Sequence, residues 1–415
     1  MDDAKPSTTD WMTADAAARA LGVSRSTLYA YVSRGLVRSQ AAPGTPQRRY
    51  RRDEIERLAH ERGRARKPAL VAQASLDWGR PVLDSALTLI EDGRLYYRGR
   101  DAADLSRTAS LEEVAALLWA CDEAALASAP VSRVAPAPMR GIATRPVPER
   151  CLAAFAWLQA ASAAQATGVD EAMRLLRIMT TVVGGRAATR APVHAQLARA
   201  WGLDARGADL LRRALVLCAD HELNASGFAA RCVASTNAAL GACVVAGLAA
   251  LSGDRHCGVT TAIEQLWDAT RGARAARLAA VVGERLSDGG GVPGQRLAGF
   301  GHLLYPDGDP RAIALLDALP ARDRHPVLLA AVSERLDERP SIDYALVALC
   351  RHLGRPDGSA YGVFALGRTV GWLAHALEQQ RGNTLIRPRA NYIGPRPGRT
   401  VSALEALPSR VVRRR

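Results

Sequence analysis

The 415-residue sequence is poor in aromatic residues, which make up 5% of the chain and include only four phenylalanines. Its seven cysteines are an odd number, and they form no CxxC pair and no metal-ligand spacing with histidine. A disulfide framework and a metal site are therefore not indicated, and we expect reduced thiols, most of them in the core. The longest apolar run, 238–251, falls short of the roughly 20 residues of a membrane-spanning helix and predicts a buried helix instead.

Other signals are missing as well. The sequence contains no P-loop and no GxSxG elbow, so it does not indicate a P-loop NTPase or an α/β-hydrolase. The first ten residues are polar and begin acidic, unlike a signal peptide. We therefore expect a cytoplasmic protein without a membrane partner.

Alanine and arginine dominate the composition, and with leucine they are good helix formers. Apolar residues recur at helical spacing from residue 75 onward, as in the stretches 111–120, 150–161 and 173–185. The clearest strand signal, at 80–99, predicts a small hairpin. The length allows two or three domains, and we expect an all-α fold in the larger part of the chain.

The net charge of +14 is concentrated near the N-terminus. Residues 1–67 hold 14 basic and 8 acidic side chains, so this sixth of the chain carries +6. Such an excess favours a polyanionic partner. The basic tail "RVVRRR" is interpreted as solvated, and 395–415 gives no indication of function.

Residues 11–58 combine two short helices with a basic hairpin. Thr13 is a suitable N-cap for a first helix that Gly22 ends, and Ser24 begins a second helix that ends at Gly35. Two short helices joined by a tight glycine turn form a helix-turn-helix. "LVRSQ" and "QRRYR" flank "AAPGTP" and predict a two-stranded wing, and Asp53 caps the helix after it. The residues expected to face inward are Ala17, Ala18, Leu21, Leu28 and Val32.

This segment resembles the winged helix-turn-helix of MerR-type regulators and excisionases, whose "T..AA..LGVSRSTLY" pattern it matches nearly throughout. The resemblance implies DNA binding, with the second helix in the major groove and the wing on the backbone. The alternative is a module that now contacts protein or is vestigial. We assign 1–62 to this domain and 63–74 to a linker. The implied DNA contacts are Arg25, Ser26, Thr27 and Tyr29 of the helix and Arg48, Arg49 and Arg51 of the wing.

The stretch "GFGHLLYPDGDPRA" at 299–312 places His302 in a glycine-framed loop and Arg311 behind an Asp-Pro turn. More histidines, arginines and one aspartate lie at the expected ends of helices. Three imidazoles, one carboxylate and three guanidiniums together suit a substrate with two or three carboxylates and proton transfer at carbon. The full set is His221, His256, His302, Asp343, Arg311, Arg368 and Arg387.

The region 75–395 resembles the citrate synthase family, which includes citrate and 2-methylcitrate synthases. The matching motifs are "LYYRGRDAADL", "LEEVAALLW", "DHELNAS.FAARCVAST", "GFGH..YP.GDPRA", "GRT.GW.AH.LEQ" and "IRPRANYIGP", in family order. The resemblance implies an all-α, two-domain subunit that dimerises, with its site in the cleft. Within 75–415, the large subdomain would comprise 75–221 and 331–415, and the small one 222–330.

The family's chemistry is implied too. Asp343 would take a proton from acetyl-CoA, neutral His256 would hydrogen-bond the thioester oxygen, and His302 would polarise the keto group of oxaloacetate. Citrate and CoA would be released, with acetyl-CoA as co-substrate and no cofactor or metal. The implied carboxylate ligands are His221, Arg311, Arg368 and, from the partner subunit, Arg387, and the implied CoA contacts are Gly299, Phe300 and Gly301.

The sequence departs from the family at three places. Where Gly-Gly-Ala-Asn-Glu usually follows the first catalytic histidine, this chain has Cys257 to Thr261, and Leu303 stands where many members have arginine. Ser-Ile replaces the common Asn-Val before Asp343. Cys257 is either a reactive thiol or a small packing residue. Two alternatives stay open: a 2-methylcitrate synthase using propionyl-CoA, and a transcription regulator with a catalytically weak synthase fold that senses metabolites or acyl-CoA.

Overall fold

The structure is a computed structural model. It describes residues 11–21, 23, 28, 32, 37–41, 48–52, 54–55, 83–129, 131, 141–161, 168–288, 297–390 and 392. The chain divides into two units, of which Ser85–Arg387 is the larger, and Met1–Asp84 with Pro388–Arg415 forms the smaller. Each unit is described by itself.

The smaller unit contains a three-stranded antiparallel sheet and a helix. Strands β1 (Trp11–Thr13), β3 (Arg48–Arg51) and β2 (Ser39–Ala41) follow one another in that order across the sheet. Helix α1 (Ala14–Leu21) begins beside Thr13, whose hydroxyl accepts the Ala16 N–H at 3.3 Å and confirms the predicted cap.

The prediction of a two-stranded wing was incomplete, because β1 adds a third strand along β3. A three-residue strand directly before a helix leaves no periodic signal in the sequence. The core contains Ala17, Ala18, Leu21, Leu28, Tyr50 and Ile55, with Val32 packed against it. The predicted helix signals at Gly22, Ser24, Gly35 and Asp53 lie outside the described residues.

The larger unit begins with the predicted hairpin, formed by β4 (Thr88–Glu91) and β5 (Arg94–Tyr97), to which β6 (Arg100–Asp101) adds a short edge. All its remaining named elements are helical, and the helices predicted at 111–120, 150–161, 173–185 and 238–251 are confirmed. They are α5 (Ala102–Thr108), α6 (Leu111–Trp119), α7 (Glu123–Ser128), α9 (Val147–Ala161), α10 (Gly168–Gly184), α11 (Val193–Trp201), α12 (Ala205–Cys218), α13 (Ala225–Ala234), α14 (Leu240–Leu251), α15 (Val259–Thr270), α16 (Ala275–Asp288), α17 (Pro310–Ala318), the 3₁₀ turn η2 (Ala321–Arg324), α18 (Pro326–Leu336), α19 (Ile342–His352) and α20 (Ser359–Gly382).

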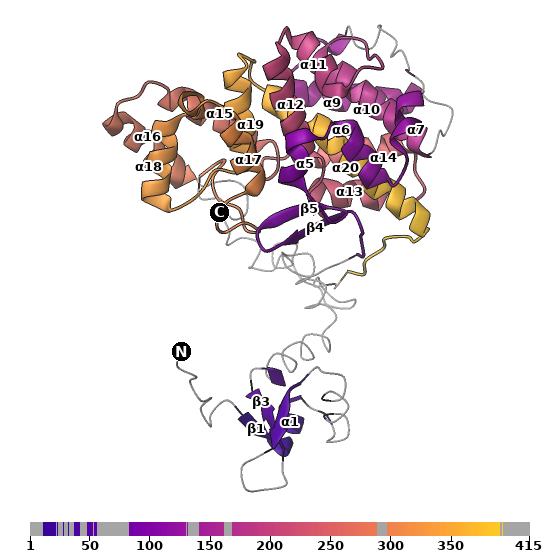
Figure 1. Cartoon of the computed structure of the whole chain (residues 1–415), viewed down its shortest axis with the longest axis vertical. Coiled ribbons are helices and arrows are strands. Elements are labelled where there is room, and N and C mark those ends of the chain that lie inside the picture. Colours follow the sequence, from indigo (N-terminus) through magenta and orange to yellow (C-terminus); the bar gives the residue numbers. More distant parts are fainter. Residues whose placement is uncertain are drawn as a thin grey trace, which may run out of the picture. The chain divides into compact units, whose positions relative to one another are not determined.

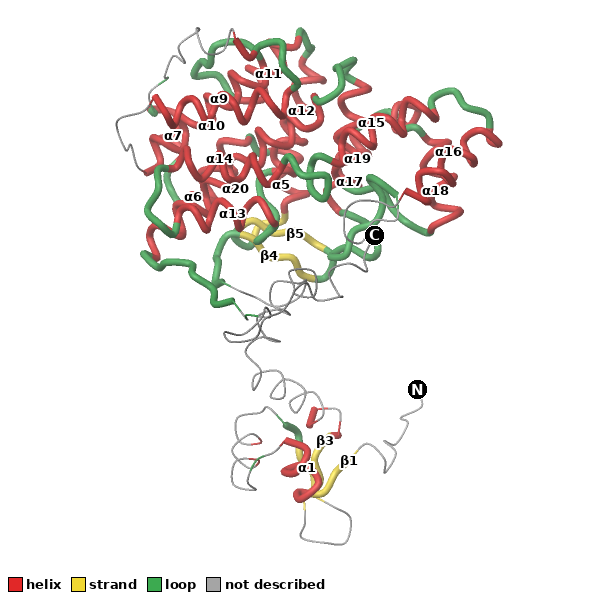
Figure 2. Tube along the Cα trace, turned by 180° about the vertical axis from the view of Figure 1, so that it is seen from behind, coloured by secondary structure: helices red, strands yellow, loops and turns green. Residues whose placement is uncertain are grey.

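The helices of the larger unit form two groups, which both views show (Figures 1 and 2). Helices α15 to α19 gather on one side, and α6, α7, α9 to α14 and α20 on the other. The 24-residue α20 is buried along most of its length and packs against α6, α9, α10, α12, α13, α14 and α19. The subdomain limits at 222 and 330 stay a prediction. Of the described helices, none combines the length and apolarity needed to cross a bilayer.

Two glycines let α20 approach the end of α12 closely. A Cβ on Gly367 would lie 2.7 Å from the Leu215 carbonyl oxygen, and a Cβ on Gly371 would lie 2.4 Å from that of Ala219. Their spacing of four residues places both on one face of the helix. The glycines of "GRTVGW" are therefore packing residues.

A buried carboxyl joins α15 to the start of α20. Oε1 of Glu264 accepts the Gly358 N–H at 2.9 Å, and Gly358 is the N-cap of α20. Nearby, Arg351 of α19 pairs with Asp268 and Asp357, both at 2.8 Å. Burial raises the pKa of Glu264 to about 7, although the bond from Gly358 opposes the shift.

This pKa predicts a pH-dependent stability. When folding raises the pKa of an acid, the protonated acid contributes to the stability of the folded state. For Glu264 this contribution is full below pH 4.5, its ordinary pKa, and is lost as the pH rises to 7. The loss should be about 3 kcal/mol. The Glu264→Gln variant should remove it, because the amide oxygen still accepts the Gly358 N–H and does not titrate.

Denaturant unfolding at pH 5 and pH 8 would measure the effect, with Glu123→Gln on the exposed side of α7 as control. We expect Glu264→Gln to be more stable than wild type at pH 8 and the control to follow wild type. The same pH dependence in both variants would contradict a buried, titrating Glu264.

Candidate active site

Three aromatic rings from two distant segments meet in the larger unit. His221 lies in the turn between α12 and α13, and its Nε2 is 3.0 Å from the hydroxyl of Tyr305 in the loop before α17. The ring of His302 lies 5.3 Å from His221 and 4.8 Å from Tyr305, centroid to centroid. The two predicted histidines are thus brought together, and Tyr305, which the sequence interpretation missed, packs against both of them.

Arg311 is held by a carboxylate from its own segment. Asp309 is the N-cap of α17, and its two oxygens accept Nε and Nη2 of Arg311 at 2.9 and 2.8 Å. The Ile342 N–H donates to the same carboxylate at 3.0 Å. Burial alone would raise the pKa of Asp309, but the Arg311 guanidinium lowers it below its ordinary value.

The predicted Asp-Pro turn is therefore a helix start. Pro310 occupies the first position of α17, and Arg311 lies in the first turn of that helix, almost fully buried. Proline at the first helical position after an aspartate cap is a common N-terminal signal, and it could have been recognised in the sequence.

Arg368 of α20 is the second predicted site arginine that is buried. Its Nε donates to the carbonyl oxygen of Cys218, the last residue of α12, at 2.8 Å. Its Nη2 is buried and has no hydrogen-bond partner among the described residues. A buried donor without a partner is costly, so this nitrogen favours an anionic ligand.

His256 is oriented by α13. Asn224, the N-cap of α13, accepts the Ser226 and Gly227 N–H groups on Oδ1, which fixes its amide. The Ser226 hydroxyl donates to that oxygen at 2.8 Å, and its own oxygen lies 2.8 Å from Nε2 of His256, which donates to it when the ring is neutral. If the hydroxyl turns its proton from Asn224 to Nε2, the neutral ring carries its proton on Nδ1 and can donate it to a ligand. The sequence indicates Asn224 as a helix cap, because asparagine is favoured at that position, but it does not indicate the contact with His256.

Both His256 and His302 are neutral at pH 7. Burial, together with Arg368 and Arg311, lowers the pKa of His256 to about 3. Burial and Arg311 lower the pKa of His302 to about 4. The Leu304 N–H faces Nδ1 of His302 at 3.2 Å, so the proton of that ring is on Nε2. Each ring can donate a hydrogen bond without carrying a charge.

Asp343 lies in the first turn of α19, as predicted, and forms no ion pair among the described residues. Burial raises the pKa of its carboxyl to about 6, while Arg311 acts in the opposite direction. A carboxylate whose pKa lies near the working pH is suited to general base catalysis.

The glycine-framed loop is tied to the segment before α19. Gly299 and Gly301 have φ angles of 86° and 83°, which glycine adopts readily. Gly301 donates its N–H to the Arg339 carbonyl, and Gly299 accepts the Ser341 N–H, both at 2.8 Å. The side chain of Phe300 is fully buried, so only its backbone could meet CoA.

Other predicted residues lie apart or outside the described residues. Arg387 is exposed beyond α20, and no described contact joins it to the predicted histidines or to the buried arginines. Its role in a partner's site therefore stays a prediction. Cys257 is fully buried, and burial raises the pKa of its thiol well above the ordinary value, which favours the packing interpretation. Of the predicted DNA contacts, Arg25, Ser26, Thr27 and Tyr29 lie outside the described residues.

The wing arginines are described. Arg48 is exposed, and its Nε donates to the Ser39 hydroxyl at 2.9 Å across β2 and β3. Arg49 is half-buried, as is Arg51, whose guanidinium lies 5.7 Å from the ring of Trp11. Arg48 is therefore the most accessible of the three.

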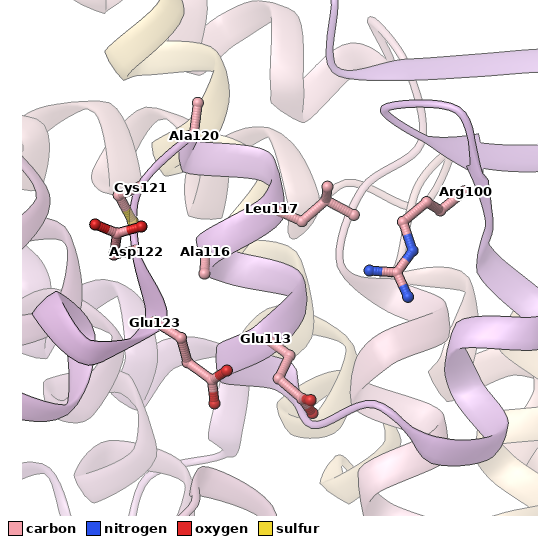
Figure 3. Close-up of a pocket in the computed structure, with 8 residues that line it drawn as sticks. All are labelled: Arg100, Glu113, Ala116, Leu117, Ala120, Cys121, Asp122 and Glu123. Atoms are coloured by element: carbon pink, nitrogen blue, oxygen red, sulfur yellow. The ribbon is translucent and has the colours of Figure 1, made fainter.

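A pocket of about 610 Å³ lies elsewhere, along α6 and the segment before α7 (Figure 3). The close-up shows Arg100 and Leu117 on one side of it and Cys121 and Asp122 on the other. None of the predicted site residues lines this pocket.

Two family descriptions match the chain. "Citrate synthase, C-terminal domain" covers residues 76–389, and "Helix-turn-helix domain" covers 11–63. The chain belongs to the citrate synthase family. The resemblance inferred from the motifs is confirmed for both parts.

Citrate synthase family members of known sequence differ in how much they share with this chain. Putative citrate synthase 2 of Mycobacterium tuberculosis is 35% identical over 194 residues, which are 44% of this chain and 50% of that protein. The citrate synthase of Mycolicibacterium smegmatis is 28% identical over 73% of this chain and 90% of its own. The 2-methylcitrate synthase of Shewanella oneidensis is 31% identical over 45% and 51%. The chain spans about half the length of the first and third of these relatives.

Solved structures show the same fold. A ternary complex of citrate synthase from Thermoplasma acidophilum with carboxymethyl coenzyme A and oxaloacetate matches with a TM-score of 0.66 at 23% identity, over 79% of this chain and 97% of that one. Citrate synthase from Thermotoga maritima matches with a TM-score of 0.63 at 24% identity, over 81% and 98%. The predicted all-α citrate synthase fold is thereby confirmed.

The pair Asp309–Arg311 generates a prediction. Removing one partner of a buried ion pair leaves a buried charge uncompensated, so Asp309→Asn should lower the free energy of unfolding by about 3–5 kcal/mol. The exposed pair Asp317–Arg324, at 3.2 Å, is the control. Asp317→Asn should change the free energy by about 1 kcal/mol or less. Denaturant titration would measure both, and similar small losses would show that water solvates Arg311.

Proposed function

We propose that the chain is a citrate synthase-type acyltransferase that condenses acetyl-CoA with oxaloacetate and water to give citrate and CoA. The observation that carries the proposal is Asp343, whose carboxyl has a pKa near 6, in the same charged cluster as two neutral histidines and two buried guanidiniums. The relatives named citrate synthase support it.

The reaction uses neutral histidines and an ionised Asp343, with the Ser226 hydroxyl turned to donate to Nε2 of His256. Asp343 as carboxylate takes a proton from the α-carbon of the thioester, and His256 donates a hydrogen bond to the thioester oxygen, which stabilises the enol. The enol carbon then attacks the keto carbon of oxaloacetate. His302 donates from Nε2 to the keto oxygen and supports the alkoxide that forms. Water cleaves the thioester bond of the product and releases CoA as thiol.

Substrate binding uses the buried cations. The carboxylates of oxaloacetate would bind His221, Arg311 and Arg368, and the unpartnered Nη2 of Arg368 supplies a donor for one of them. Arg387 would come from the partner subunit of a homodimer. The proposal includes a cytoplasmic location, the backbone of Gly299 to Gly301 as CoA contact, and no cofactor besides acetyl-CoA as co-substrate.

The proposal allows two acyl chains, acetyl and propionyl. One relative is named a 2-methylcitrate synthase, so propionyl-CoA is the alternative substrate. Leu303, exposed beside His302, and Cys257 beside His256 are two of the positions where this chain departs from the family.

The test is release of free thiol from acetyl-CoA or propionyl-CoA in the presence of oxaloacetate. Asp343→Ala should lower kcat by about 10²–10⁴-fold, because it removes the base. In the wild type, kcat/KM should fall as the pH drops below about 6, since protonated Asp343 cannot accept a proton. Asp317→Ala, on the exposed side of α17, is the control. Turnover that survives Asp343→Ala would refute the assigned role.

A second candidate function is transcription regulation, which the helix-turn-helix match at 11–63 favours. The citrate synthase fold would then act as a metabolite or acyl-CoA sensor. A dimer would present two reading domains, so its DNA sites would be inverted repeats.

DNA binding predicts a steep dependence on salt. Arg48→Ala should weaken binding to genomic fragments and reduce the slope of log K against log salt by about one, as expected for one lost phosphate contact. Arg206→Ala, on the exposed surface of α12, is the control in the larger unit. A mobility-shift titration at several salt concentrations measures both. Binding that is absent or insensitive to salt would exclude this candidate.

A further inference from the structure

One face of α20 continues beyond Arg368. His375 follows it by seven residues, which is two helical turns, and so lies on the same side of the helix. The ring is 1% exposed, and the mechanism above does not use it. The second half of the motif "GRTVGWLAHALEQ" thus has no role yet.

The contacts of His375 fix its tautomer. Nη1 of Arg231, on α13, lies 3.3 Å from Nδ1 of the ring. A guanidinium can only donate, so Nδ1 is the acceptor and the proton is on Nε2. Arg231 is held in turn by Gln379 at 2.7 Å and by Glu378 at 2.8 Å.

The proton on Nε2 faces the turn that carries His221. Nε2 lies 3.1 Å from the carbonyl oxygen of Glu222 and 3.4 Å from Oδ1 of Asp220. His375 therefore reaches the residue before and the residue after His221. Gly227 leaves the room for this, because a Cβ there would lie 3.4 Å from Cδ2 of the ring and 3.3 Å from the Glu222 oxygen.

The turn needs such support. Glu222 has a φ of 53°, a left-handed conformation that side-chain-bearing residues adopt at a cost. Asp220 is fully buried, and the Thr88 hydroxyl donates to its other oxygen. The direction in which His221 points depends on the backbone between these two residues.

We propose that His375 is a positioning residue: through Glu222 and Asp220 it holds His221 in the orientation that binds a carboxylate of the keto-acid substrate. The inference rests on the proposed function, in which His221 is a carboxylate ligand. It predicts that His375 controls the binding of the dicarboxylate and leaves proton abstraction by Asp343 unaffected.

Two substitutions separate this role from simple packing. In His375→Gln the amide nitrogen reaches the position of Nε2 and can donate to Glu222. In His375→Asn the side chain reaches only the position of Nδ1. We expect His375→Asn to raise the KM for oxaloacetate roughly tenfold, as for one lost hydrogen bond at a charged ligand, with kcat and the KM for acetyl-CoA within about twofold. His375→Gln should restore most of the loss. His352→Asn, which alters the pair with Asp323 at 2.9 Å, is the control and should leave each parameter unchanged.

A second readout does not require turnover. In ¹⁵N spectra of the histidine rings of the unliganded protein, the signal of His221 should move in His375→Asn and stay in place in His375→Gln and His352→Asn. Wild type without turnover would remove the proposed function, and the His221 signal would then decide the positioning role alone. An unmoved His221 signal in His375→Asn, or a KM that rises equally for both substrates, would overturn the inference.

Discussion

The close contact between α20 and the C-terminal end of α12 is the constraint on which the site depends. Gly367 and Gly371 bring the two backbones together, and Arg368, between them on the same helix, donates to the Cys218 carbonyl. This carbonyl is one of those that a helix end leaves without an internal partner, and a cation is favourable at that end. The hydrogen bond from Arg368 therefore satisfies a backbone acceptor at the end of α12. It also fixes a guanidinium beside the start of the turn that carries His221.

The same principle recurs around the cluster. Arg311 is fixed by the cap of α17, His256 by the cap residue of α13 through Ser226, and Asp343 by the first turn of α19. Helix ends offer unsatisfied backbone groups and rigid geometry together. Because the reactive side chains are anchored at the ends of several helices, the packing of those helices sets their separation.

Much of this arrangement could be predicted from the sequence, because local signals carried it. The periodic apolar stretches predict the helices, and Thr13 predicts a helix cap. The motifs place His221, His302 and Asp343 at the ends of elements. The rest depended on contacts between distant segments. The contacts of Tyr305 with His221, of Ser226 with His256 and of His375 with Glu222 join residues that are between 30 and 153 positions apart. The left-handed Glu222 is also invisible in the sequence, since no glycine marks it.

The unpartnered Nη2 of Arg368 has a thermodynamic consequence. A buried donor without an acceptor lowers the stability of the unliganded fold by about 1–3 kcal/mol. A carboxylate that reaches this nitrogen returns that free energy when it binds. At this nitrogen, affinity for the anion and stability of the unliganded protein therefore oppose each other. A change that stabilises the unliganded protein by giving Nη2 a partner weakens binding of the anion.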